Sequence, residues 1–293
     1  MKKLITISLL LAVLTTYGQS FNNEITSGEK YAALSGKINK DGLESGSYAD
    51  WFQKNFESYQ PKQNIINLLK NELPNYTIKA FMGTWCGDSK REVPKFYKVL
   101  EAANFPLDRL TMVAVDRSRD TYKQSPGGEE EGMLIHRVPT FIVYKDGKEL
   151  NRIVEEPVVT IEEDLLRILR NEYIPNYHGV TLANKMLSEM GVEKFSKKQK
   201  KIVGKLKEVI KSYGELSTYS SVLFYADQQE EAIAVARLNL AMYPKESRTY
   251  IGLGNKLRQM GDSSEALKIY QKALELNPEN EKLKTTISEM TTK

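Results

Sequence analysis

The stretch "AFMGTWCGDSKREVPKF", residues 80–96, contains the only cysteine of the 293-residue chain, Cys86. Residues 76–83, "YTIKAFMG", are rich in β-branched and aromatic side chains and predict a strand. Residues 89–103, "SKREVPKFYKVLEAA", place apolar side chains at helical spacing. They predict a helix that Pro94 should kink rather than end. Cys86 is therefore expected where a strand ends and a helix begins.

The expected position of Cys86 favours the thiolate form of its side chain. The first turn of a helix carries unpaired N–H groups and the positive end of the helix dipole, and both stabilise a negative sulfur. Ser89 lies one turn along, where its hydroxyl could donate a hydrogen bond to the sulfur. Lys90 and Arg91 add positive charge nearby, and Asp88 opposes them. The pattern predicts a nucleophilic thiol, with a small buried apolar side chain as the alternative.

The segments around the cysteine alternate between strand and helix signals. Thr160 is expected to cap the last helix, with Glu163 in capping-box spacing. Asp146-Gly147 predicts a tight turn between two strands. The expected elements are a helix over 63–73, strands over 76–83 and 110–116, a loop over 125–132, two strands within 138–155 and a helix over 160–173. Together they predict one α/β layer.

Four separated motifs then follow one another in a recognisable order. They are "WCG" at 85–87, Pro94, "VPT" at 138–140 and "KDG" at 145–147. In this order they resemble the thioredoxin family, over about residues 60–174. In that family the proline matching Pro139 is cis and lies against the active-site cysteine, and the backbone of the preceding residue pairs with the substrate peptide.

The resemblance implies a set of site residues. Cys86 would be the catalytic nucleophile, and Ser89 would help to stabilise its thiolate. The residues that would bind a substrate peptide are Trp85, Val138 and Pro139. The implied partners are client proteins or peptides that contain cysteines.

Two departures from the family pattern affect the same reaction step. Ser89 stands where the family has its second, resolving cysteine, and Ala80 stands where many members have a buried acid. Cys86 alone can form a mixed disulfide but cannot release the client by closing a ring with a second thiol. The resemblance therefore implies disulfide exchange of the isomerase or monothiol type, with release by a client thiol or an external thiol reductant.

Two other functions are compatible with the same residues. The first is a non-catalytic binding scaffold that holds a peptide along Val138 and on the helices of the second half. The second is a peroxide-reactive thiol that forms a sulfenic acid, which would need a positively charged pocket around Cys86. His136 lies three residues before Pro139 and could approach the sulfur as a base, or it could face solvent in a loop.

The second half of the chain carries helical signals and an internal repeat. Residues 225–244, "YADQQEEAIAVARLNLAMYP", align with residues 259–278 at a spacing of 34 positions, which is the period of the tetratricopeptide repeat. The unit at 247–280 resembles that family closely, whereas the unit at 213–246 is degenerate. This resemblance implies a protein-interaction surface. The alternative is that these helices only support the thiol-containing domain.

The first residues predict a secretory signal peptide. Lys2 and Lys3 precede an apolar run over 4–14 and a small, polar segment that ends near Gly18. The apolar run is well short of the roughly 20 residues that a membrane helix needs. We therefore expect an exported protein, periplasmic or secreted, that does not span a membrane after signal removal. A lone thiol in an oxidising compartment is typically reactive or paired with another chain.

Composition and motif content argue against several other classes of function. Without Lys2 and Lys3, 40 basic residues face 38 acidic ones, so charge gives no reason to expect nucleic-acid or membrane-surface binding. The two histidines and one cysteine form no pair at metal-ligand spacing, and there is no glycine-rich phosphate loop. We expect no metal and no cofactor.

The expected fold class is an α/β thioredoxin-like domain followed by an all-α helical repeat domain. The expected divisions are a signal peptide over 1–18, an N-terminal extension over 19–59, the thioredoxin-like domain over 60–174, a helical linker over 175–212 and the tetratricopeptide-repeat-like domain over 213–293.

Overall fold

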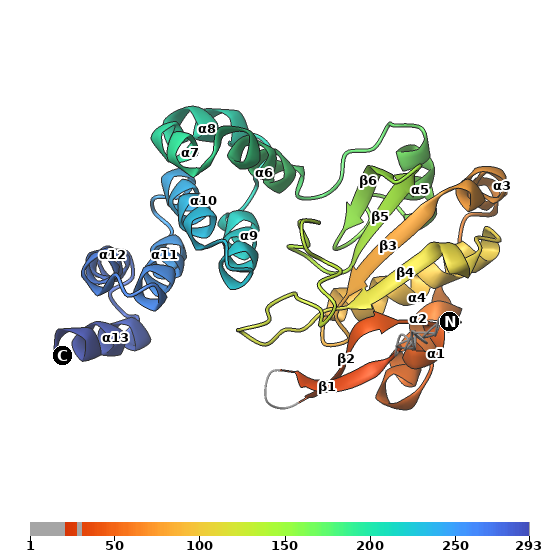
Figure 1. Cartoon of the computed structure of the whole chain (residues 1–293), viewed down its shortest axis with the longest axis horizontal. Coiled ribbons are helices and arrows are strands. Elements are labelled where there is room, and N and C mark those ends of the chain that lie inside the picture. The colour runs from red at the N-terminus through yellow and green to blue at the C-terminus, as the bar shows by residue number, and fades with distance from the viewer. Residues whose placement is uncertain (1–20, 28–30, 293) are drawn as a thin grey trace, which may run out of the picture.

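The computed structural model describes residues 21–27 and 31–292, and the predicted signal peptide lies outside these residues. The first half forms one six-stranded sheet in the order β1-β2-β4-β3-β5-β6 (Figure 1). The strands are β1 (Asn23–Ser27), β2 (Tyr31–Ile38), β3 (Thr77–Met82), β4 (Leu110–Ala114), β5 (Thr140–Lys145) and β6 (Lys148–Val154). The strands predicted around the cysteine are confirmed.

Strand pairing places the thiol at one edge of the sheet. β3 and β4 are parallel, with Ile78 opposite Leu110 and Met82 opposite Ala114, and every other neighbouring pair is antiparallel. Parallel strands end at the same edge, so Cys86, four residues beyond Met82, lies near the carboxyl ends of both strands.

The predicted hairpin joins β5 and β6. Asp146 and Gly147 have φ values of +51° and +76°, the left-handed pair that a two-residue turn of this kind requires.

Five helices of the first half cover one face of the sheet (Figure 1). They are α1 (Lys40–Leu43), α2 (Ala49–Ser58), α3 (Gln63–Glu72), α4 (Gly87–Ala102) and α5 (Ile161–Leu169). Pro94 lies inside α4. Phe96 of α4 stacks on Phe141 of β5 with ring centroids 4.0 Å apart, and both side chains are buried. This stack fixes the helix that begins at Cys86 against the sheet. The Thr160 hydroxyl caps α5 by accepting from the Glu163 N–H, and the helix ends four residues before its predicted limit.

The opposite face of the sheet is covered without a helix. Phe81, Val113 and Ile142 point to that face and pack against Ile135 and Val138. The last two residues belong to the segment 115–139, in which the structure has only turns and irregular backbone. We call this segment the β4–β5 loop. Its covering role matters because it carries Val138 and Pro139.

Residues 21–59 contribute directly to the sheet. They form β1 and β2, and β2 pairs with β4 from Gly36 to Ile38. The sequence "YAALSGKI" of β2 lacks regular alternation of apolar and polar side chains, which explains why the strand was not predicted. The expected division between an extension and a thioredoxin-like domain at residue 60 stays a prediction, but one sheet crosses it.

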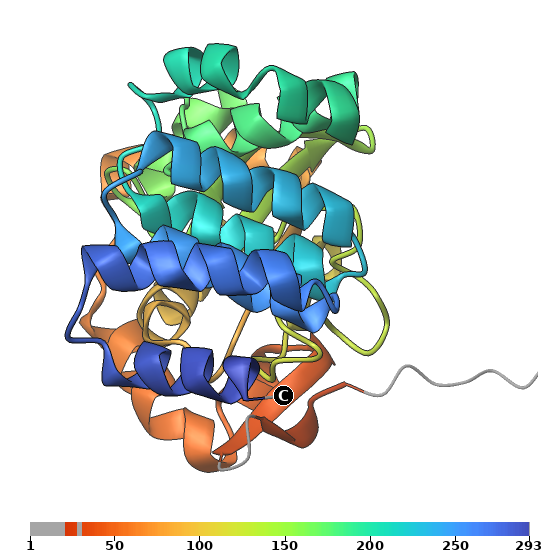
Figure 2. The same ribbon diagram turned by 90° about the vertical axis from the view of Figure 1, so that its left-hand side faces the viewer.

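The second half contains only helices. They are α6 (His178–Met190), α7 (Val192–Lys197), α8 (Gln199–Leu206), α9 (Tyr213–Tyr225), α10 (Gln229–Met242), α11 (Ser247–Gln259), α12 (Ser263–Leu276) and α13 (Glu281–Thr291). Helices α6–α10 share one apolar core, and α11–α13 form a second one with α10. Figure 2 shows these helices stacked in rows in front of the sheet. The predicted fold class, α/β followed by all-α repeats, is confirmed.

Close helix packing explains the small residues of the repeat. A Cβ atom at Gly254 would lie 2.6 Å from the buried Tyr270 ring, so this position requires glycine. In the degenerate unit, Ser220 replaces the corresponding glycine and donates a hydrogen bond to the Ala232 carbonyl oxygen at 2.7 Å. The first unit therefore keeps the paired-helix arrangement without glycine at this position.

No helix within the described part of the chain is long and apolar enough to cross a membrane.

Candidate functional site

Cys86 lies where the sequence places it, between β3 and α4. It is the N-cap residue of α4, and its carbonyl oxygen accepts from the Lys90 N–H at 3.0 Å. The side chain is half-buried, and its sulfur donates a hydrogen bond to the Val138 carbonyl oxygen at 3.3 Å. The peptide bond between Val138 and Pro139 is cis. The fold thus brings Cys86 and the Val138-Pro139 step together across 52 residues of sequence.

Trp85 is anchored beside the thiol. Its indole N–H donates to the Val115 carbonyl oxygen at 2.8 Å, and its ring packs with Cys86 on the apolar face under the β4–β5 loop. A Cβ atom at Gly83 would lie 2.4 Å from the indole, so the glycine before "TWC" gives the ring its space. The assigned role of Trp85 in client binding stays a prediction.

Ser89 does not contact the sulfur. Its side chain is fully buried, and its hydroxyl accepts from the Gly83 N–H at 3.2 Å. Within the described part of the chain no hydrogen bond joins Ser89 to Cys86, so the expected donation from Ser89 was wrong. The reason is that the first turn of α4 directs Ser89 back towards the end of β3.

Lys90 and Arg91, in the first turns of α4, are also engaged away from the sulfur. Arg91 pairs with Asp88 at 2.9 Å and with Glu92 at 2.5 Å. The Lys90 ammonium lies 6.0 Å from the centre of the Trp51 ring, on the side of α2. Trp51 itself packs against the helix-covered core.

A lysine that the sequence analysis did not single out lies close to the thiol. Lys123 is only 5% exposed, and its ammonium lies 5.6 Å from the centre of the Trp85 ring and 5.2 Å from that of Tyr122. Burial lowers the pKa of Lys123 to about 8, whereas the charge on Cys86 acts to raise it. Nothing in the charged stretch "RSRDTYKQ", residues 117–124, distinguishes this lysine in sequence.

Arg137, also missed in sequence, ties the site to the helical half. It pairs with Glu155 at 2.9 Å, and its guanidinium lies 4.9 Å from the centre of the Tyr177 ring. It also donates to the Gly214 carbonyl oxygen of α9 at 3.5 Å. The Tyr177 hydroxyl donates to Glu155. Arg137 directly precedes Val138, so the helices help to hold the step that faces the sulfur.

The β4–β5 loop touches the helical half at further points. Gln124 donates to the Tyr225 carbonyl oxygen, and the rings of Tyr122 and Tyr225 meet edge-on at 6.3 Å. Leu134 packs against the core of α6–α10. Figure 1 shows this loop reaching from the sheet to α9. One side of the loop therefore covers the sheet while the other contacts α9.

His136 is neither a base for the thiol nor a solvent-facing residue. It is 2% exposed, its Nδ1 lies 3.2 Å from the Leu134 carbonyl oxygen, and its ring packs edge-on against Tyr177. Burial lowers the pKa of His136 to about 3. The imidazole is thus neutral at pH 7 and far too weak a base to take a thiol proton.

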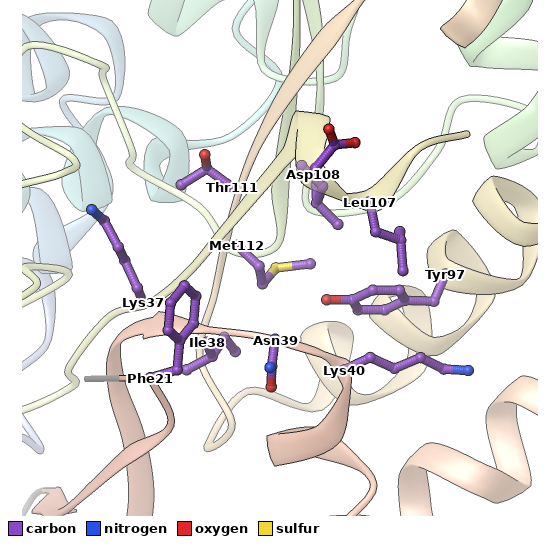
Figure 3. Close-up of a pocket in the computed structure, with 11 residues that line it drawn as sticks. Phe21, Lys37, Ile38, Asn39, Lys40, Tyr97, Leu107, Asp108, Thr111 and Met112 are labelled. Carbon is purple, nitrogen blue, oxygen red and sulfur yellow. The ribbon is translucent and has the colours of Figure 1, made fainter. Parts of the chain in front are cut away.

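A cavity of about 390 Å³ lies away from the thiol. It is lined by residues around the start of β4 and the end of β2, among them Phe21, Tyr97 and Met112 (Figure 3). Because β3 and β4 are parallel, the start of β4 and Cys86 lie at opposite ends of the sheet. Across residues 21–27 and 31–292, no cluster of three or more His, Cys, Asp or Glu side chains could hold a metal ion.

Comparisons with known proteins match both halves of this description. Residues 247–280 match the tetratricopeptide repeat family. Thioredoxin-3, mitochondrial, of Saccharomyces cerevisiae is 26% identical over 117 residues, which are 39% of this chain and 83% of that protein. Thioredoxin Asp f 28 of Aspergillus fumigatus is 32% identical over 87 residues, 29% of this chain and 71% of that protein. Thioredoxin of Chlamydia trachomatis is 36% identical over 74 residues, 25% of this chain and 63% of that protein.

Proposed function

This chain belongs to the thioredoxin family and carries a tetratricopeptide repeat, and on that premise we propose that it is an exported protein that exchanges disulfides through Cys86. The observation that carries the proposal is the position of the Cys86 sulfur. It lies at the first turn of α4 and 3.3 Å from the Val138 carbonyl oxygen, beside the cis Pro139. A client backbone that pairs with Val138 would bring its disulfide to this sulfur.

The proposed reaction has two balanced steps. In the first, the Cys86 thiolate attacks one sulfur of a client disulfide, so that a new S–S bond forms, the client S–S bond breaks, and the second client sulfur leaves as a thiolate. In the second, a thiol of the client or a small external thiol attacks the mixed disulfide as its thiolate, and Cys86 leaves as a thiolate. If a client thiol attacks, the client is isomerised with no net oxidation or reduction. If a small external thiol attacks, it becomes disulfide-bonded to the client sulfur as Cys86 leaves. A second external thiol then attacks that bond, so that the client leaves as a dithiol and the two external thiols are oxidised to their disulfide.

We propose that the helical half holds or selects clients next to the thiol. The tetratricopeptide repeat at 247–280 is a class of structure used for protein interaction. The contact of Arg137 with Gly214 supports the idea that α9 borders the same region. Client proteins or peptides with cysteines are the proposed partners.

The absence of a second cysteine predicts that mixed disulfides accumulate. Incubation of the protein with an excess of a disulfide-containing peptide should give a stable adduct on Cys86, which intact mass spectrometry detects and added dithiothreitol reverses. The Ser89→Cys variant is the matched control, since it restores a second thiol three residues on and should release the peptide without external thiol. A wild-type protein that never forms the adduct would contradict the proposal.

Export is proposed from the sequence alone, through the basic and apolar start over 1–14 and the small residue Gly18. When the full chain is expressed in a bacterial host, the protein recovered from outside the cytoplasm should lack about the first 18 residues. Protein that keeps Met1 and stays with the cytoplasmic fraction would contradict export.

A second candidate function is a non-catalytic scaffold. It is favoured by Ser89 and the buried Ala80, which remove the two groups that serve the second step in the family. In this case the cis Pro139 and the helices would hold a peptide without exchange. Peptide binding without any catalysis of disulfide exchange would distinguish this scaffold from the first function.

A further inference from the structure

Hydrogen bonds fix the backbone around Lys123. Its N–H donates to the Asp116 carbonyl oxygen at 2.9 Å, and the Asp116 N–H donates to the Gln124 carbonyl oxygen at 2.9 Å. Its φ of +60° lies in the left-handed region, which few lysines adopt. These contacts fold the start of the β4–β5 loop back on itself just beyond β4.

The Lys123 side chain extends over the indole next to the thiol. The ammonium lies 5.6 Å from the Trp85 ring, and the indole is fixed by its bond to the Val115 carbonyl oxygen. Of the charged groups around Lys123, Cys86 acts most strongly on the lysine, although burial is the larger influence overall. The ammonium therefore lies over the side chain of the residue that directly precedes Cys86, and both Trp85 and Cys86 pack on the same apolar face.

The other charged groups near the pair have partners of their own. The Asp116 carboxylate accepts from the Arg117 N–H at 2.7 Å and from the Thr121 hydroxyl at 2.6 Å. Arg137 pairs with Glu155 at 2.9 Å, and these two act on Lys123 in opposite directions. The Tyr122 hydroxyl is neutral at pH 7, because burial raises its pKa. His136 is neutral as well.

On α4, Asp88 is paired with Arg91. Among the described residues, no carboxylate lies within ion-pair distance of the Lys123 ammonium. A nearly buried ammonium without a carboxylate partner favours a negative charge at whatever group it faces.

We propose that the Lys123 ammonium stabilises negative charge on the Cys86 sulfur, both when the sulfur attacks a client disulfide and when it leaves the mixed disulfide. This inference rests on the proposed function and deepens it. Lys123 acts by charge alone, forms no bond and transfers no proton, so the balance of the two exchange steps is unchanged. It supplies the thiolate stabilisation that Ser89, bonded to the Gly83 N–H, does not.

The test compares two buried lysines of the same chain. Lys256 of α11 is 8% exposed and lies 5.9 Å from the Phe224 ring, so it matches Lys123 in burial and aromatic contact but belongs to the helical repeat. The Lys123→Met and Lys256→Met variants each lose one positive charge and keep an unbranched side chain that is one heavy atom shorter. The measurement is the rate of Cys86 alkylation by iodoacetamide between pH 4 and 11 in the folded, full-length protein.

We expect Cys86 in Lys123→Met to be alkylated about tenfold more slowly than in the wild type at pH 7, because the sulfur loses a nearby positive charge. The wild-type and Lys123→Met profiles should meet above about pH 10, where a free thiol is ionised, because access to the sulfur is unchanged. Lys256→Met should follow the wild type throughout.

Two results would overturn the role of Lys123. One is a Lys123→Met profile that coincides with the wild type, and the other is an equal loss of rate in Lys256→Met. Far-ultraviolet circular dichroism of the full chain shows whether each variant is folded, and Lys123→Gln is a second neutral variant expected to give the same loss of rate.

Failure of the proposed function is distinguishable from failure of this inference. If Cys86 is alkylated but forms no adduct with a peptide disulfide, exchange is wrong while the effect of Lys123 on the sulfur is still measured. If adducts form and the profiles coincide, exchange stands and the role of Lys123 is wrong.

Discussion

Replacement of Cys86 by serine is expected to abolish disulfide exchange completely. Serine keeps the shape of the half-buried side chain and can still donate to the Val138 carbonyl oxygen, but its hydroxyl cannot form an S–S bond. Because the chain has no other thiol, nothing can substitute for the lost nucleophile. The measurement is recovery of activity by a client enzyme with scrambled disulfides, in the presence of a small thiol. Recovery with Cys86→Ser should fall to the rate in the small thiol alone.

The Cys86→Ser variant also distinguishes disulfide exchange from peptide binding without exchange. Binding of a peptide without cysteines is measured in parallel, and Cys86→Ser should leave it unchanged because the backbone of Val138 and the helical repeat remain. If the wild type also fails to raise recovery above the small-thiol rate, while both proteins bind the peptide equally, the scaffold is the correct function. Ser89→Ala is the control, since its hydroxyl bonds to the Gly83 N–H and not to the sulfur.

The second large effect is expected in the core behind the thiol. Phe96→Ala should lower the free energy of unfolding of the sheet-containing half by about 3–5 kcal/mol. Phe96 and Phe141 are buried and stacked at 4.0 Å, so truncation removes the apolar contact of α4 with β5 and leaves a cavity. Urea unfolding followed by tryptophan fluorescence reports this half specifically, because both tryptophans, Trp51 and Trp85, lie in it.

The matched variant for this prediction is Phe96→Leu, which keeps most of the apolar volume and should cost less than about 1.5 kcal/mol. A loss below about 1 kcal/mol in Phe96→Ala would show that the stack contributes little and that the site is held by other contacts. Because Phe96 joins the helix that begins at Cys86 to the strand that follows Pro139, we also expect slower adduct formation in Phe96→Ala.

Local patterns explain what could be predicted. The turn residues Asp146-Gly147, the Thr160 cap and the helical spacing over 63–73 each act within a few residues, so the sequence indicates them directly. The 34-residue spacing indicated the repeat in the same way, and the family match covers the predicted unit, 247–280. The strand and helix signals predicted Cys86 at a helix start, and the family resemblance implied that Pro139 lies against it. In the structure Cys86 begins α4 and its sulfur bonds to the Val138 carbonyl oxygen, beside Pro139.

Contacts between distant segments explain what could not be predicted. Lys123 and Arg137 look like ordinary loop residues in sequence, because the burial of Lys123 and the contacts of Arg137 depend on how the β4–β5 loop folds over the sheet and against α9. The helical position of Ser89 suggested a bond to sulfur, but the Gly83 N–H at the end of β3 is the nearer partner. One turn of spacing fixes which residues are neighbours along a helix, not which of the surrounding groups each one meets.

By itself, the sequence determined the type and order of most elements and the single thiol at a helix start. These features arise from interactions along a short stretch of chain, and side-chain periodicity, turn residues and motif spacing record such interactions. Tertiary contacts alone join β1 and β2 to the sheet and bury Lys123 over the Trp85 ring. Those contacts join segments far apart in sequence through packing and burial. Neither segment has a periodic pattern of side chains that predicts such a contact.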